Sequence, residues 1–182
     1  MIRPVLLAAA LSIPTAAHTQ HAAHPASPSA SPVASALREN AQRSQRILVA
    51  AAEDMPANKY GFKPTPAQMS FGQLVLHVAG ANEFMCSSVT GAARPTEAKL
   101  TAESPKEALV ARLKRSFEFC HSALAPLTDA ALGDSVPFFG GRRVTRAAMI
   151  LAMAGDWFDH YAAAAIYLRL NGILPPTARK PS

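Results

Sequence analysis

Four stretches of the sequence carry apolar residues at intervals of three and four positions, the spacing that gathers them on one face of an α-helix. Alanine dominates the apolar residues while valine and isoleucine are sparse, which favours helices over strands. These patterns predict helices over residues 34–54, 70–89, 104–127 and 145–171. Four helices of similar length without strand patterns predict an all-α fold, a four-helix bundle.

Capping signals mark several of the helix ends. Ser70, followed three residues later by Gln73, predicts a capping box at the start of the second helix. Ser104 is expected to cap the third helix, with Pro105 at its first helical position. The connection before the fourth helix contains Pro137-Phe-Phe-Gly-Gly, which indicates a short turn or hairpin over one end of the bundle.

The ends of the chain differ in composition from the expected bundle. Arg3, an apolar run and small residues at 15–17 are typical of a secretory signal peptide. The apolar run is too short for a stable membrane anchor, so we expect an exported, periplasmic protein. The expected divisions are a signal peptide over 1–17, a disordered tether rich in Ala, Ser, Pro and His over 18–35, the bundle over 36–176, and a flexible tail over 177–182.

The net charge of +6 comes from basic residues that are scattered rather than gathered in one stripe. A nucleic-acid-binding protein requires a concentrated basic surface and a recognisable module, and the sequence has neither. We therefore expect no nucleic-acid partner.

The two cysteines, Cys86 and Cys120, predict a disulfide in an exported chain. Cys86 lies as far past Ser70 as Cys120 lies past Ser104. The bridge is therefore within reach if the second and third helices are parallel, whereas antiparallel helices would separate the two cysteines by roughly 10 Å or more. Long crossover connections, which the chain has between its helices, make parallel neighbours feasible.

The fourth helix contains a pair of potential metal ligands. Asp156 and His160 are four residues apart and therefore project from the same helix face, which Ala163 and Tyr167 continue. One interpretation is an Asp–His pair that stabilises the helix, and another is an ion pair of Asp156 with Arg146 or Arg169. A third is a metal site.

A metal site requires a further ligand, and His77 in the second helix is the candidate. Taken alone, His77 also fits a hydrogen-bonded histidine of the core. Two imidazoles and one carboxylate leave coordination positions open, as catalytic zinc and non-haem iron sites do. Trp157, Tyr161 and Tyr167 are expected to pack in the core or to line a pocket beside this site.

His121, next to Cys120, lies off the apolar face of the third helix. We expect it to be exposed and without a chemical role.

Two stretches resemble a known family. Residues 55–88, MPANKYGFKPTPAQMSFGQLVLHVAGANEFMCSS, and residues 159–176, DHYAAAAIYLRLNGILPP, are similar to exported DinB-like proteins. The resemblance implies a four-helix bundle with parallel middle helices and, as in many members, a homodimer. It also implies a divalent metal, often zinc or nickel, held by three histidines, and a relation to metal-dependent thiol transferases.

Carried over by position, His77 matches the first histidine of the family and His160 the last. Asp156 stands in place of the middle histidine, and Ala162 and Ala163 replace the usual glycine and polar residue. A carboxylate replaces an imidazole at zinc, iron or manganese sites but is shorter and harder. The site has therefore changed its metal preference, weakened, or been lost.

Two functions follow. In the first, zinc, nickel or iron at His77, Asp156 and His160 serves a transferase or hydrolase acting on an unidentified small molecule. In the second, the protein is a non-catalytic envelope binding or structural module with a degenerate site and no cofactor.

Overall fold

The computed structural model describes residues 30–180, so the expected signal peptide and most of the expected tether lie outside the described residues. Four long helices make up the body and confirm the all-α four-helix bundle; they are α1 (Pro32–Asp54), α2 (Phe71–Thr90), α3 (Lys106–Leu124) and α4 (Arg146–Leu170). The short elements are the strands β1 (Ser135–Pro137) and β2 (Arg143–Thr145) and the 3-10 turns η1 (Ala57–Lys59), η2 (Asp129–Ala131), η3 (Phe139–Gly141) and η4 (Pro176–Ala178).

Helix α1 begins earlier than its local sequence indicates. Pro32 occupies its first turn, so residues 32–35 are helical rather than part of the tether. The carboxylate of Asp129 accepts hydrogen bonds from the backbone N–H groups of Val33 and Ala34, at 2.9 and 2.8 Å. This cap comes from a residue 96 positions after Val33 and therefore leaves no local signal in the sequence.

The start of α2 agrees with its prediction, whereas the start of α3 does not. The Ser70 hydroxyl accepts from the Gln73 backbone N–H at 3.2 Å, and the Gln73 side chain accepts from the Ser70 N–H at 2.7 Å, which completes the capping box. In α3, Pro105 is itself the extended cap residue (φ −51°, ψ 140°). The Ser104 hydroxyl instead accepts from the Thr101 N–H at 3.0 Å and closes the preceding turn.

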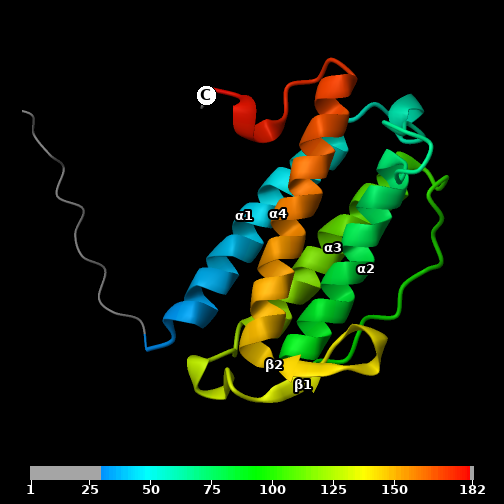
Figure 1. Ribbon diagram of the computed structural model, residues 1–182. Coiled ribbons are helices and arrows are strands. Elements are labelled where there is room, and N and C mark those ends of the chain that lie inside the picture. The colour runs from blue at the N-terminus through cyan, green and yellow to red at the C-terminus, as the bar shows by residue number, and fades with distance from the viewer. Residues whose placement is uncertain (1–29, 181–182) are drawn as a thin grey trace, which may run out of the picture.

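Helices α2 and α3 run in the same direction, and α1 and α4 run in the opposite one (Figure 1). The contacts between α2 and α3 stay in step along the pair. Asn82 donates to the Ser116 hydroxyl at 3.0 Å, and Cys86 forms a disulfide with Cys120; both pairs are separated by 34 residues. A constant separation is expected of parallel helices in register, and the bridge predicted from the sequence is present. Helices α1 and α2 each contact both α3 and α4.

A long connection makes the parallel arrangement possible. Residues 91–105, which we call the strap, return along the outside of the bundle from the end of α2 to the start of α3 (Figure 1). Glu97 fastens the strap to α3 through ion pairs with Arg115 at 2.8 Å and Arg112 at 3.8 Å. Arg112 also pairs with Glu83 of α2 at 2.7 Å. The strap is thereby held against the helices it joins.

The expected turn before α4 is a two-stranded hairpin. Strands β1 and β2 pair antiparallel at the end of the bundle opposite the start of α2 (Figure 1). Gly140 and Gly141 between them have φ angles of 67° and 73°, a conformation that glycine adopts at little cost.

The interior is apolar, with Trp157, Phe71 and Phe117 among its fully buried large side chains. None of the helices within residues 30–180 is long and apolar enough to cross a membrane.

We predict that replacing both Cys86 and Cys120 by alanine lowers the free energy of unfolding by about 3 to 4 kcal/mol. The bridge closes a loop whose ends are 34 residues apart in sequence, and opening it restores the entropy of the unfolded chain. Urea denaturation of the two proteins measures the difference. Intact-mass spectrometry of the wild type should first show two hydrogens fewer than the reduced chain; two free thiols would contradict the bridge.

Candidate metal centre

His77 from α2 and Asp156 and His160 from α4 lie together where these two helices pack against each other. One potential ligand atom from each residue lies within 4.8 Å of the other two. His77 is exposed, and Asp156 and His160 are half-buried, so the cluster opens to the surface. The exposure of His77 excludes the interpretation as a core histidine.

A backbone hydrogen bond orients His160. Its Nδ1 lies 2.7 Å from the carbonyl oxygen of Asp156, one helical turn earlier. A carbonyl oxygen only accepts, so Nδ1 carries the proton and Nε2 keeps its lone pair. This is the usual arrangement of a metal-binding histidine, in which one ring nitrogen donates to a carbonyl and the other is left for the cation. The ring of His77 stacks on that of His160 with centroids 4.7 Å apart.

Asp156 is the least satisfied member of the cluster. Its Oδ1 lies 3.4 Å from His160 Nδ1, and its Oδ2 is buried without a hydrogen-bond partner within the described chain. Neither arginine considered as its partner pairs with it among residues 30–180. Arg146 pairs with Asp134 at 3.2 Å instead.

Burial raises the pKa of Asp156, because the interior disfavours its charged form. His160 and His77 partly offset this increase, and Asp159 adds to it by charge repulsion. A half-buried carboxylate with an unpartnered oxygen and a raised pKa is the type of group that a bound cation stabilises.

The donor set fits a divalent cation after a small adjustment. Two ligands that each lie about 2.1 Å from one ion are at most about 4.2 Å apart, which is closer than the outer limit of the cluster. Because His77 is exposed, its side chain has room to rotate toward the other two residues. Two imidazoles and one carboxylate suit zinc, iron or nickel better than calcium or magnesium.

A depression of about 300 Å³ adjoins the cluster on the side of His160. Gln68, Asp159, Ala163 and Tyr167 are among its walls. The Tyr167 hydroxyl donates to the Met69 carbonyl at 2.8 Å and so fixes the segment before α2 against α4. A larger depression of about 570 Å³ lies between the starts of α2 and α3, one turn from His77 at Gln73.

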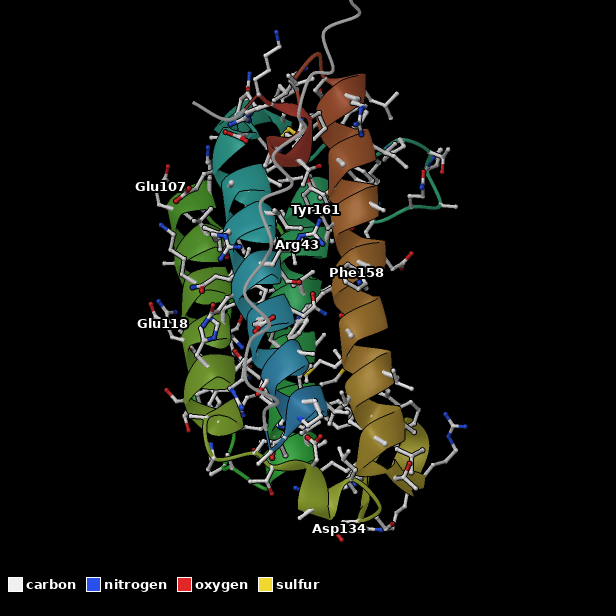
Figure 2. The ribbon with its side chains drawn as sticks, turned by 90° about the vertical axis from the view of Figure 1, so that its left-hand side faces the viewer. Arg43, Glu107, Glu118, Asp134, Phe158 and Tyr161 are labelled. Atoms are coloured by element: carbon white, nitrogen blue, oxygen red, sulfur yellow. A yellow bond between two sulfur atoms is a disulfide. The ribbon has the colours of Figure 1, made fainter. Side chains whose placement is uncertain are left out.

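The two aromatic residues next to the cluster point away from it. Trp157 is fully buried in the core beside Phe117, with ring centroids 6.0 Å apart. Tyr161 lies on the side of α1, where its hydroxyl donates to Thr177 at 2.8 Å (Figure 2). Of the three aromatic residues expected at a pocket, Tyr167 is the one that borders the depression.

Asn82 positions α4 but was not recognised in the sequence. Its Oδ1 accepts from Trp157 Nε1 at 2.7 Å, while its Nδ2 donates to Ser116 at 3.0 Å. These bonds fix the rotation of α4 about its axis, which turns Asp156 and His160 toward α2. The available signal was one amide, followed by Glu83, in a mostly apolar stretch of α2, and a buried amide is normally hydrogen-bonded.

His121 is not exposed, contrary to expectation. It is half-buried, and its Nε2 lies 2.7 Å from Gln45 Oε1. Burial lowers the pKa of His121. Its partner belongs to α1, which a pattern within α3 does not reveal.

Comparison with known proteins identifies relatives of the whole bundle. A family model described as the DinB superfamily matches residues 40–164. No curated protein matches the chain.

Solved structures share the fold. A DinB-like protein from Bacillus subtilis has 22% sequence identity and a TM-score of 0.64, and the match covers 80% of this chain and 99% of that one. A conserved protein from Enterococcus faecalis has 18% identity and a TM-score of 0.62, with 76% and 96% covered. A DinB-like protein from Bacillus cereus has 15% identity and a TM-score of 0.61, with 79% and 93% covered.

We predict that Asn82→Ala lowers the free energy of unfolding by about 2 to 4 kcal/mol, because Trp157 Nε1 loses its buried partner and a cavity forms. Urea denaturation measures the loss. Gln42→Ala, at an exposed position of α1, is the control and should change stability by less than about 0.5 kcal/mol. Equal effects of the two substitutions would contradict the role of Asn82.

We also predict that Asp156→Asn stabilises the metal-free protein at pH 7. Because folding raises the pKa of Asp156, its carboxyl favours the folded state below its ordinary pKa, and this contribution is lost as the pH rises through the raised value. The advantage of the variant should therefore shrink toward about pH 4. Urea denaturation in a chelator at both pH values tests this, with Glu39→Gln at an exposed position of α1 as the control. A variant less stable than wild type at pH 7 would refute the prediction.

Proposed function

The chain belongs to the DinB superfamily, and from that premise we propose that it binds a divalent cation through His77, Asp156 and His160. The observation that carries the proposal is the state of Asp156, whose buried Oδ2 has no partner among the described residues. A cation beside it would supply the missing interaction. The orientation of His160, with Nδ1 bonded and Nε2 free, supports the same conclusion.

The proposed activity is a transfer or hydrolysis reaction on a small molecule. Three protein ligands leave coordination positions open, and a bound cation polarises a substrate or lowers the pKa of water. The depression beside His160 would hold the substrate, with the carboxylate of Asp159 and the amide of Gln68 at its walls to orient polar groups. Tyr167, through its bond to Met69, keeps the opposite wall in place.

A second function, a non-catalytic binding or structural module, is supported by the rim of the centre. Ala163 borders the depression and Ala162 is exposed beside it, so neither offers a polar group to a reacting molecule. In this case the Asp156–His160 pair is a remnant of the site in relatives.

We also propose that the protein acts outside the inner membrane, in the periplasm. The signal pattern of residues 1–17 supports export, and the buried disulfide is of the kind that forms in an oxidising compartment.

We predict that the untagged protein binds Zn²⁺ or Ni²⁺ with one ion per chain in isothermal titration. His77→Ala and His160→Ala should each weaken binding by about tenfold or more, because each removes a ligand. His121→Ala, on α3, is the matched control and should leave binding unchanged. Asp156→His, which restores the ligand type of relatives, should tighten Ni²⁺ binding by about tenfold.

The same experiment separates the two functions. Failure of wild type to bind Zn²⁺, Ni²⁺ or Fe²⁺ would overturn the metal centre and favour the structural module. Binding that survives both His77→Ala and His160→Ala would place the cation elsewhere.

A further inference from the structure

Phenylalanine rings and arginines form one surface where the hairpin meets α2 and the strap. The members of this surface, which we call the hairpin patch, are Phe84, Arg94, Phe138, Phe139 and Arg142. Phe84 belongs to α2 and Arg94 to the strap, and the others belong to the loop between β1 and β2. The hairpin and the start of the strap lie at the same end of the bundle (Figure 1).

Each arginine of the patch lies over an aromatic ring. The guanidinium carbon of Arg94 is 4.6 Å from the centre of the Phe84 ring. That of Arg142 is 4.9 Å from the centre of the Phe138 ring. Phe139 joins the two halves, because its ring lies 4.4 Å from that of Phe84 and 5.1 Å from that of Phe138. The patch is therefore one continuous set of contacts that holds two cations against apolar rings.

Both arginines keep N–H groups available for an anionic ligand. Neither Arg94 nor Arg142 forms an ion pair with a carboxylate within residues 30–180. Glu97, the next acidic residue after Arg94 in the strap, pairs with Arg115 of α3 instead. Arg142 donates from Nε to the Phe139 carbonyl at 3.5 Å, which leaves its two terminal nitrogens for another acceptor. The edge of a guanidinium that stacks through its face matches two oxygens of a phosphate.

Phe139 supplies an apolar group that the core does not use. It is 48% exposed, whereas Phe84 and Phe138 are half-buried. Gly140 and Gly141 reverse the chain directly after it, so the ring lies at the tip of the hairpin. An exposed ring beside arginines suits a membrane–water interface, where aromatic rings lie at the level of the headgroups and long basic side chains reach the phosphates.

From these contacts we propose that the hairpin patch binds the surface of a bilayer that contains anionic phospholipids. Phe139 enters the headgroup region, and Arg94 and Arg142 bind lipid phosphates beside it. Each basic residue near an anionic surface contributes modestly, so two arginines and one ring predict reversible association rather than stable anchoring. The proposal does not depend on the metal centre.

The position of the patch favours a lipid surface over another macromolecule. It lies at one end of an elongated bundle, where a flat surface can reach it without contacting the sides of the helices (Figure 1). A bilayer also presents many phosphates, so the two arginines need no partner of matching shape. Nucleic acid would require a longer basic stripe than these two residues provide.

Co-sedimentation with vesicles of phosphatidylglycerol and phosphatidylcholine in equal parts tests the proposal. The full chain is used throughout, so that any contribution of residues 1–29 is common to every protein. We expect Arg94→Gln/Arg142→Gln to weaken binding by about tenfold or more, because two phosphate contacts are lost. Arg43→Gln/Arg46→Gln, which removes two exposed charges from α1, is the matched control and should weaken binding less. A wild type that does not bind, equal effects of the two double variants, or equal binding to phosphatidylcholine alone would overturn the proposal.

Fluorescence of a tryptophan in place of Phe139 tests whether the patch itself meets the membrane. The native Trp157 is fully buried and supplies a constant background. The emission of Phe139→Trp should shift to shorter wavelength when anionic vesicles are added, because the new ring leaves water. Leu174→Trp is the matched control and should not shift, since Leu174 is 56% exposed but follows the far end of α4. No shift for Phe139→Trp, or equal shifts for both variants, would refute binding through the patch. Thermal unfolding checks that all variants remain folded.

Discussion

The side-chain amide of Asn82 joins three helices in a largely apolar interior. It accepts from Trp157 of α4 and donates to Ser116 of α3 while belonging to α2 itself. A buried amide or indole N–H left without a partner costs about 1–3 kcal/mol, so arrangements that separate these groups are disfavoured. One turn further along α2, the disulfide fixes the heights of α2 and α3 relative to each other. The rotation of α4 about its own axis, which Asn82 fixes, and the height of α2, which the disulfide fixes, together place His77 next to Asp156 and His160.

The parts of the fold that depend on neighbours in sequence could be predicted. The spans of the four helices, the capping box at Ser70 and the hairpin turn follow from residue spacing and capping chemistry. The equal heights of Cys86 and Cys120 also led to the parallel pair. The early start of α1 was missed: Asp129 caps it from 96 positions later in the chain, and Pro32 in the first turn was the local signal that was available. At α3 the capping pattern predicted the wrong residue. Pro105 has an extended conformation and is the cap itself, not the first helical residue.

That His77, Asp156 and His160 lie together could be predicted, but the environment of the cluster could not. Spacing places Asp156 and His160 on one face, and the resemblance to relatives adds His77. Whether that face is buried depends on how α4 is rotated, which Asn82 and Trp157 decide. The unpartnered Oδ2 of Asp156 is likewise a property of the packing. Keeping such a carboxylate costs stability, and the proposed metal site would explain why the chain keeps it.

The course of the strap has a consequence for how this chain tolerates change. It crosses the outside of the bundle and joins two helices that the disulfide already links, so cutting it once would leave both pieces covalently attached. Lengthening it would add surface loop without altering the helix register that aligns the centre. The strap can therefore change in length during evolution without moving the three candidate metal ligands, and the ligands can change without affecting the strap.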